Sequence, residues 1–226
     1  MGLPVTVLCS AGAERVFAWL REVDARFSPF REDSEVCRID RGELAPGDAH
    51  PDVRAVLARC ERLRVATGGY FDARAGGSLD PSGLVKGWAV DRAAALLEGP
   101  FCIDAGGDVL VRGGPWRVGV RHPRRGRELC AALALTDAAV ATSGAYERGD
   151  HVLDPVGGGP ARGALSVTVV GRSLGTADAF ATAAFAMGAR GPAWTARLRG
   201  CEAMTVLDDG DVLSTPGLAR LRVPLA

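Results

Sequence analysis

An acid and a hydroxyl stand four residues apart in the segment TADAFATAA, which runs from Thr176 to Ala184. On a helix this spacing places Asp178 and Thr182 on one face, one turn from each other. The simplest explanation is structural, because an acid near a helix start complements the dipole and a threonine can bond back to its own turn. The alternative is a site for a hard metal ion such as Mg²⁺, which is typically held by few protein oxygens together with waters and a substrate phosphate.

The segment LDPSGLVKGWAVDRA, from Leu79 to Ala93, places an acid and a base around a glycine turn that leads into a predicted helix. Backbone N–H groups at such a helix start can hold an anion, and Lys86 lies in the first turns behind Asp80. The GxxxxGK[ST] spacing of a P-loop is absent. A phosphate-binding turn and a capped helix with solvated charges explain this pattern about equally well.

Two adjacent glycines, Gly106 and Gly107, interrupt an apolar run and are flanked by Asp104 and Asp108. Adjacent glycines predict backbone that bends sharply or that approaches a ligand closely. On this pattern alone, a tight turn with both acids facing water is the favoured interpretation.

Groups that can form hydrogen bonds to a ligand gather in the segment AVATSGAYERGDHVLDP, from Ala139 to Pro155. Thr142, Ser143 and Gly144 could donate hydrogen bonds there. His151 is one of only three histidines in the chain. A lone histidine is more often structural than catalytic, but His151 is the best candidate in this sequence for acid–base work.

Hydrophobic periodicity and turn residues predict the elements that carry these segments. Helices are expected from a Ser10 cap to about Ala25, from Pro51 to about Ala66, from Val85 to Glu98, from Thr176 to Gly188 and around Ala193–Leu198. Strands are expected at Val5–Cys9, Cys102–Val111, Trp116–Arg121, Cys130–Leu135, Ala138–Thr142, Leu165–Gly171, Ala203–Leu207 and Val212–Ser214. Runs of strands beside runs of helices favour an α+β fold, and the lack of a linker or repeat favours one domain over residues 1–226.

Charge and cysteine content limit the function classes. The chain has 27 basic and 27 acidic residues, and a net charge near zero argues against nucleic acid as the main partner. Its six cysteines form no CxxC pair, so neither a zinc site nor a thioredoxin-like motif is expected. No run of 18 apolar residues predicts a membrane span, and the start MGLPVTVLCS lacks the features of a signal peptide, so we expect a cytoplasmic protein.

Taken together and in order, these segments resemble the FAD:protein FMN transferases, also called the ApbE family. The resemblance covers nearly the whole chain and rests on motifs at Met1–Gly2, SPFREDSEVCRI (28–39), GGYFD (68–72), Leu79–Ala93, Ile103–Gly114, WRVGVRHP (116–123), VATSGAYER (140–148), HVLDP (151–155), Ser166–Val170 and Thr176–Gly188. It implies the α+β architecture of that family, in which T-fold-like antiparallel sheets pack with helices.

The resemblance also implies an activity, in which Mg²⁺ helps to cleave the pyrophosphate of FAD. The FMN half is attached to a Thr or Ser of an acceptor flavoprotein, and AMP is released. The Gly83 carbonyl, Asp178 and Thr182 would hold the metal, so Asp178 would be catalytic, and His151 would help to deprotonate the acceptor hydroxyl. The residues implied to lie against FAD are Met1, Phe30, Tyr70, Phe71, Asp72, Asp80, Lys86, Gly106, Gly107, Thr142, Ser143 and Gly144.

Two features of the chain depart from many members of this family. Only six residues separate Asp72 from Leu79, where many relatives carry a substantial insert, and Phe30 stands where many have tyrosine.

Two other functions would use the same residues. With water as the acceptor the protein would be an FAD pyrophosphatase, and without chemistry it would be a non-catalytic FAD-binding protein.

Overall fold

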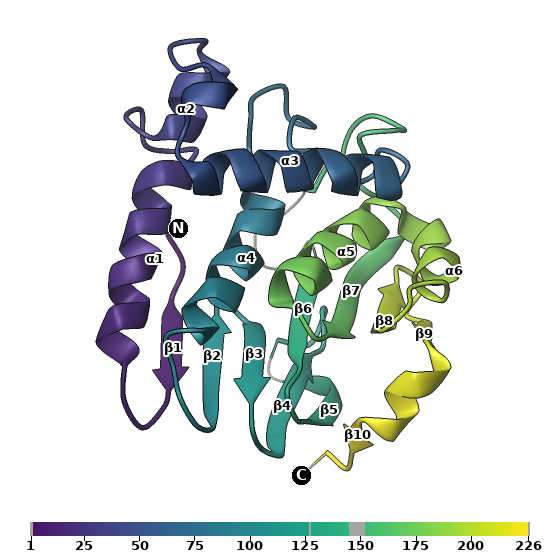
Figure 1. Ribbon diagram of the computed structural model, residues 1–226. Coiled ribbons are helices and arrows are strands. Elements are labelled where there is room, and N and C mark those ends of the chain that lie inside the picture. Colours follow the sequence, from purple (N-terminus) through teal and green to yellow (C-terminus); the bar gives the residue numbers. More distant parts are fainter. Residues whose placement is uncertain (1, 127, 145–151, 226) are drawn as a thin grey trace.

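The computed structural model describes residues 2–126, 128–144 and 152–225 (Figure 1). The strands in these ranges are β1 (Val5–Leu8), β2 (Phe101–Ala105), β3 (Asp108–Arg112), β4 (Trp116–Arg121), β5 (Leu129–Leu135), β6 (Ala139–Gly144), β7 (Ala164–Gly171), β8 (Glu202–Leu207), β9 (Val212–Ser214) and β10 (Arg222–Val223). The α-helices are α1 (Ala13–Phe27), α2 (Glu35–Asp40), α3 (Pro51–Ala66), α4 (Ser82–Ala94), α5 (Leu174–Ala186) and α6 (Gly191–Thr195). Short 3₁₀ turns are η1 (Pro46–Asp48), η2 (Gly188–Arg190) and η3 (Pro216–Arg220).

The described strands form two sheets. The larger has seven strands in the order β1-β2-β3-β6-β7-β8-β9, and every neighbouring pair is antiparallel. The smaller has three strands in the order β10-β5-β4, also antiparallel. Antiparallel sheets with helices gathered in separate runs confirm the predicted α+β class.

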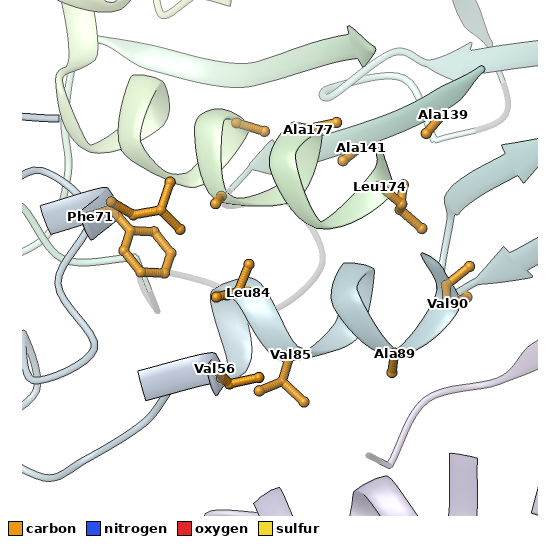
Figure 2. Close-up of a cluster of buried hydrophobic side chains, with 14 of the residues drawn as sticks. Val56, Phe71, Leu84, Val85, Ala89, Val90, Ala139, Ala141, Leu174 and Ala177 are labelled. Atoms are coloured by element: carbon orange, nitrogen blue, oxygen red, sulfur yellow. The ribbon is translucent and has the colours of Figure 1, made fainter. Parts of the chain in front are cut away.

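The seven-stranded sheet is covered by different layers on its two faces. Helices α4 and α5 lie side by side over one face, and α5 contacts β6 and β7 (Figure 1). Strand β6 shows the alternation: Ala139 and Ala141 are buried among the helices, and Val140 between them is buried against the smaller sheet. The apolar layer between α4, α5 and β6 is drawn in Figure 2, where Leu174 of α5 lies near Ala139 and Ala141.

Helices α4 and α5 cross at two glycines because the backbones are too close for a side chain. A Cβ added to Gly87 would lie 2.6 Å from the Gly175 nitrogen, and one added to Gly175 would lie 2.9 Å from the Trp88 nitrogen. Asp91 of α4 fixes the crossing, because its carboxylate accepts hydrogen bonds from the Leu174 and Gly175 N–H groups at 2.7 and 2.9 Å. A side chain of one helix thus pairs two N–H groups at the start of the next, where Ser173 caps a third, that of Thr176.

Several boundaries differ from the sequence-based predictions. The predicted cap at Ser10 is wrong, because α1 begins at Ala13 behind Gly12, whose φ of 92° lies in the left-handed region. Helix α4 begins three residues before Val85, since the Pro81 carbonyl accepts hydrogen bonds from the Leu84 and Val85 N–H groups. The short helix α2 was not predicted, because six residues are too few for a periodic pattern.

Most remaining elements agree with the predictions within two residues, but α4 ends at Ala94 and not at Glu98, α6 ends at Thr195 and not at Leu198, and β10 was not predicted. Helix α3 has the predicted bounds, and strand β4 has them too. The apolar run at Cys102–Val111 is two strands, β2 and β3, which pair in a hairpin that turns at Gly106 and Gly107. Within the described ranges, no helix combines the length and the apolar character needed to cross a bilayer.

Candidate functional site

A cavity of about 500 Å³ opens on the helical side of the seven-stranded sheet. It is bounded by the loops after α1 and α3, the first turns of α4, the β2–β3 turn, the end of β6 and one face of α5. Thirteen of the residues predicted from the sequence line it: Phe30, Tyr70, Phe71, Asp72, Asp80, Gly83, Lys86, Gly106, Thr142, Ser143, Gly144, Asp178 and Thr182. Segments from across the chain therefore converge on one site.

Of the other three predicted residues, only Gly107 is among the described residues, and it does not line this cavity. Gly107 lines a second hollow of about 430 Å³, which lies between the opposite face of the large sheet and strand β4. Gly106 and Thr142 line both spaces, because the β2–β3 turn and β6 reach the edge of the sheet where the two spaces approach each other. Met1 and His151 lie outside the described residues.

Asp178 is a buried carboxylate at the floor of the cavity. Its residue is 4% exposed, and its Oδ2 has no hydrogen-bond partner among the described residues. Burial raises the pKa of Asp178 to about 7, and the positive charge of Lys86 opposes that shift. A buried carboxylate oxygen without a partner is costly, so this oxygen is suited to a bound cation.

Thr182 completes the pair predicted from the sequence, one turn further along α5. Its Oγ1 lies 3.3 Å from the Ser143 hydroxyl of β6. Gly83 lies beside it in the first turn of α4, where an added Cβ would be 3.6 Å from Thr182 Oγ1. Carboxylate, hydroxyl and carbonyl oxygens are the ligands that hard cations prefer.

This oxygen set differs from a zinc-type centre. Among the described residues, no three His, Cys, Asp or Glu side chains gather in a way that could hold a metal. Mg²⁺ needs no such cluster, because it keeps several waters and commonly binds through one or two carboxylates and a substrate phosphate. The residues present therefore fit Mg²⁺ better than Zn²⁺.

Lys86 lies between two buried carboxylates. Its Nζ is 2.5 Å from Asp108 Oδ2 and 3.6 Å from Asp178 Oδ1. The prediction that both acids beside the glycine turn face water is wrong for Asp108, which is 2% exposed. It begins a strand that is covered by the helices on one face and by the smaller sheet on the other. The continuous apolar run that follows it, VLV, is the sequence signal of a strand covered on both faces.

The aromatic residues of the site differ in burial. Phe30 is 94% exposed at the mouth of the cavity, whereas Phe71 is 3% exposed and belongs to the hydrophobic core. Tyr70 is intermediate, and the guanidinium carbon of Arg190 lies 5.1 Å from the centre of its ring. Phe30 and Tyr70 can therefore offer ring surface to a planar ligand, and Phe71 mainly supports the wall.

Asp72 and Asp80 both stabilise backbone at the rim of the cavity. Asp72 Oδ1 accepts a hydrogen bond from the Arg74 N–H at 2.8 Å, and Asp80 Oδ1 accepts one from the Ser82 N–H at 2.9 Å. The explanation of the α4 start as a capped helix with solvated charges is therefore only partly right, because the N-cap residue Pro81 offers no side-chain cap and Lys86 pairs with the buried Asp108. Other cavity residues were not predicted individually, although Ser28, Pro29, Ser82, Val152, Leu153 and Pro155 lie in the motifs of the resemblance; Leu3 and Ser78 lie outside those motifs.

Comparison with solved structures identifies the fold. The ApbE protein from Thermotoga maritima superposes with a TM-score of 0.85 at 24% identity, covering 98% of this chain and 96% of that one. The flavin transferase ApbE from Vibrio cholerae gives the same TM-score at 22% identity, again over 98% and 96% of the two chains. The predicted architecture of antiparallel sheets packed with helices is confirmed.

Comparison with known sequences gives the family. A FAD:protein FMN transferase from Treponema pallidum is 29% identical over 223 residues, which is 82% of this chain and 61% of that protein. One from Rhodobacter capsulatus is 34% identical over 161 residues, or 63% of this chain and 31% of the relative. This chain thus spans about three-fifths or less of the length of these relatives. The ApbE family model matches residues 1–78 and 73–205, so the chain belongs to the ApbE family.

Proposed function

We propose that this protein is a Mg²⁺-dependent FAD:protein FMN transferase. The observation that carries the proposal is the buried Asp178 carboxylate, whose Oδ2 has no partner among the described residues, beside Thr182 and Lys86 at the floor of a large cavity. A protein that only stored a flavin would gain nothing from a costly buried charge at this place. Relatives of the chain carry the name of this activity.

The reaction requires that FAD place its pyrophosphate over the floor of the cavity. The exposed ring of Phe30 and the ring of Tyr70 offer stacking surfaces at the mouth, where the planar parts of FAD would lie. Lys86 supplies a positive charge on the floor, and the start of α4 supplies backbone N–H groups. Ring surface at the mouth and positive charge at the floor match the ring systems and the pyrophosphate of this substrate.

Gly83, Asp178 and Thr182 would hold Mg²⁺ in this cavity. When bound, the metal would neutralise charge on the pyrophosphate oxygens. The hydroxyl oxygen of the acceptor residue attacks the phosphorus of the FMN half, and the bond from that phosphorus to the bridging oxygen breaks. AMP leaves with the bridging oxygen, and the acceptor gives up its proton. The chain contributes mainly the positioning of these groups.

His151 is proposed as the residue that takes the proton of the acceptor hydroxyl. Histidine is suited to this role because its ordinary pKa lies near neutrality. Its sequence neighbour Val152 lines the cavity, which supports a role at the site.

We also propose that residues 1–226 form one domain, since strand β6 contributes alternate residues to the cores on both faces of the large sheet. The cytoplasmic location stays a prediction.

The test is an incubation of the purified protein with FAD and Mg²⁺, with and without a candidate acceptor flavoprotein. AMP and intact FAD are followed by chromatography, and the acceptor by mass spectrometry. Release of AMP with an FMN-sized mass gain on the acceptor is the expected result. AMP and free FMN without any acceptor would instead establish an FAD pyrophosphatase. Bound FAD that survives intact under all conditions would show a non-catalytic FAD-binding protein.

A further inference from the structure

Lys86 is the only lysine in the sequence, and every other basic side chain apart from histidine is arginine. A lysine ammonium is a compact point charge, whereas the guanidinium group of arginine is a broad planar fork. The narrow space between Asp108 Oδ2, at 2.5 Å, and Asp178 Oδ1, at 3.6 Å, suits the smaller cation. The place of the Lys86 ammonium group is therefore set by both carboxylates, Asp108 and Asp178.

Asp108 is the more firmly held of the two partners. It is 2% exposed at the start of β3, and its Oδ1 accepts a hydrogen bond from the Thr142 N–H of β6 at 3.0 Å. This bond links two neighbouring strands of the large sheet. The Asp108 carboxylate cannot turn without breaking the bond, so it provides a fixed anchor for the Lys86 ammonium group.

Asp178 would be the alternative partner for the same ammonium group. When both carboxylates are ionised, the two carboxylates and one ammonium leave one negative charge on this group of three side chains, and Asp178 Oδ2 has no hydrogen-bond partner among the described residues. Without the charge of Asp108, electrostatic attraction would draw Lys86 fully onto Asp178. An ammonium group there would compete with any cation for the same carboxylate.

We propose that Asp108 is a positioning residue that holds Lys86 nearer to itself than to Asp178 and so keeps the Asp178 carboxylate available to a divalent cation. The inference rests on the proposed metal-dependent function and extends it to a residue outside the predicted metal and FAD sets. Lys86 then lines the cavity as a fixed positive charge and neutralises Asp178 only in part.

The test is a double-mutant cycle read out by Mn²⁺ binding, measured by electron paramagnetic resonance and calorimetry on the full chain without FAD. The variants are Asp108→Asn, Lys86→Met and the two combined. Asparagine keeps an oxygen for the Thr142 N–H, so the strands should stay paired. We expect Asp108→Asn to weaken Mn²⁺ binding by about tenfold, and Lys86→Met in that background to recover most of the loss.

A simple loss of negative charge makes a different prediction. Lys86→Met would then strengthen Mn²⁺ binding by the same factor in both backgrounds, and this additive result would overturn the inference. The matched control is Asp104→Asn, which removes the other acid of the same hairpin. Asp104 accepts a hydrogen bond from the Gly107 N–H and lines the second hollow. Its loss should leave Mn²⁺ affinity within twofold of the wild type.

The single lysine permits a second readout that does not depend on activity. Protein labelled with ¹³C,¹⁵N-lysine should give one lysine side-chain signal in nuclear magnetic resonance spectra. Addition of Mg²⁺ should shift this signal little in the wild type, where Lys86 stays on Asp108, and strongly in Asp108→Asn. Equal shifts in both proteins would overturn the inference. Wild-type protein that binds neither Mn²⁺ nor Mg²⁺ would overturn the proposed metal site as well, whereas additive variants with normal wild-type binding would leave that site intact.

Discussion

The two faces of the seven-stranded sheet are built from different chemistry. Against the smaller sheet the buried side chains are mainly apolar, with Val111, Val118 and Leu133 as typical members, and a buried polar group there is the neutral Thr168 hydroxyl, which shares a hydrogen bond with Thr142. On the helical face the apolar packing surrounds an ion pair, since Lys86 and Asp108 meet beside the buried Asp178. The packed part of the first face contributes mainly to stability, and its polar groups, such as Asp104 and Arg121, line the second hollow. The second gives up part of its apolar packing in order to position charges.

The largest expected effect is on the charged face. Asp178→Asn keeps the shape of the side chain and removes its charge, so we expect transfer to fall by roughly two orders of magnitude or more. The melting temperature without ligand should not fall, because a buried charge has been removed. AMP release and thermal denaturation measure the two quantities. Asp209→Asn, in an exposed turn, is the control, and a normal rate for Asp178→Asn would refute the metal assignment.

The apolar face should respond in the opposite way. Leu133 is 1% exposed, so Leu133→Ala leaves a cavity in the core where the side chain was. We expect the free energy of unfolding to fall by about 2–5 kcal/mol. The rate of transfer well below the melting temperature should stay near that of the wild type. Denaturant titration and AMP release check both statements. Leu129→Ala in the same strand, where the residue is 44% exposed, should have little effect on either.

The crossing of α4 and α5 should couple stability to activity. Gly87→Ala forces a Cβ to within 2.6 Å of the Leu174 and Gly175 backbone, which we expect to cost about 1–3 kcal/mol of unfolding free energy. Because α4 carries Lys86 and α5 carries Asp178, the rate should fall along with stability. Gly47→Ala, where an added Cβ meets nothing within 4 Å, is the control. If Gly87→Ala lowered only the rate of transfer, or only the free energy of unfolding, the expected coupling between stability and activity would be contradicted.

The smallest effect is expected at the mouth of the cavity. Phe30 is 94% exposed, so Phe30→Ala should leave the melting temperature unchanged. Loss of one stacking ring should raise the KM for FAD by roughly twofold to tenfold with little change in kcat. Steady-state kinetics with varied FAD measure this split. Val65→Ala, at an exposed site that does not line the cavity, is the control, and an unchanged KM in Phe30→Ala would remove Phe30 from the FAD contacts.

Local sequence patterns predicted the elements well wherever they were long or bounded by strong turn residues. Helix α3 begins at Pro51 and ends before two glycines, and its bounds were predicted correctly. The spacing of Asp178 and Thr182 was enough to place both on one face of α5. These features depend on neighbouring residues only, so a single sequence can reveal them.

The rest depended on contacts between distant segments. Asp108 looks like any polar residue at a turn, and its burial follows from layers contributed by α4, α5 and the smaller sheet. Asp91 lies 83 positions before the Leu174 N–H that it caps. The gathering of cavity residues could be inferred only from the resemblance to a known family, because no local pattern says which segments meet.

Strand β6 contributes to both faces of the large sheet, because its successive side chains point to opposite sides. Val140 and Thr142 point to one side, while Ala141 and Ser143 point to the other, where Ser143 meets Thr182. Removing or inserting one residue within this strand would exchange the two sets, sending the hydroxyl into the aliphatic core and valine toward the charged floor. Insertions and deletions can therefore be tolerated in connections such as 73–78. Within β6 the number of residues must stay the same, because it decides which side chains face each side of the sheet.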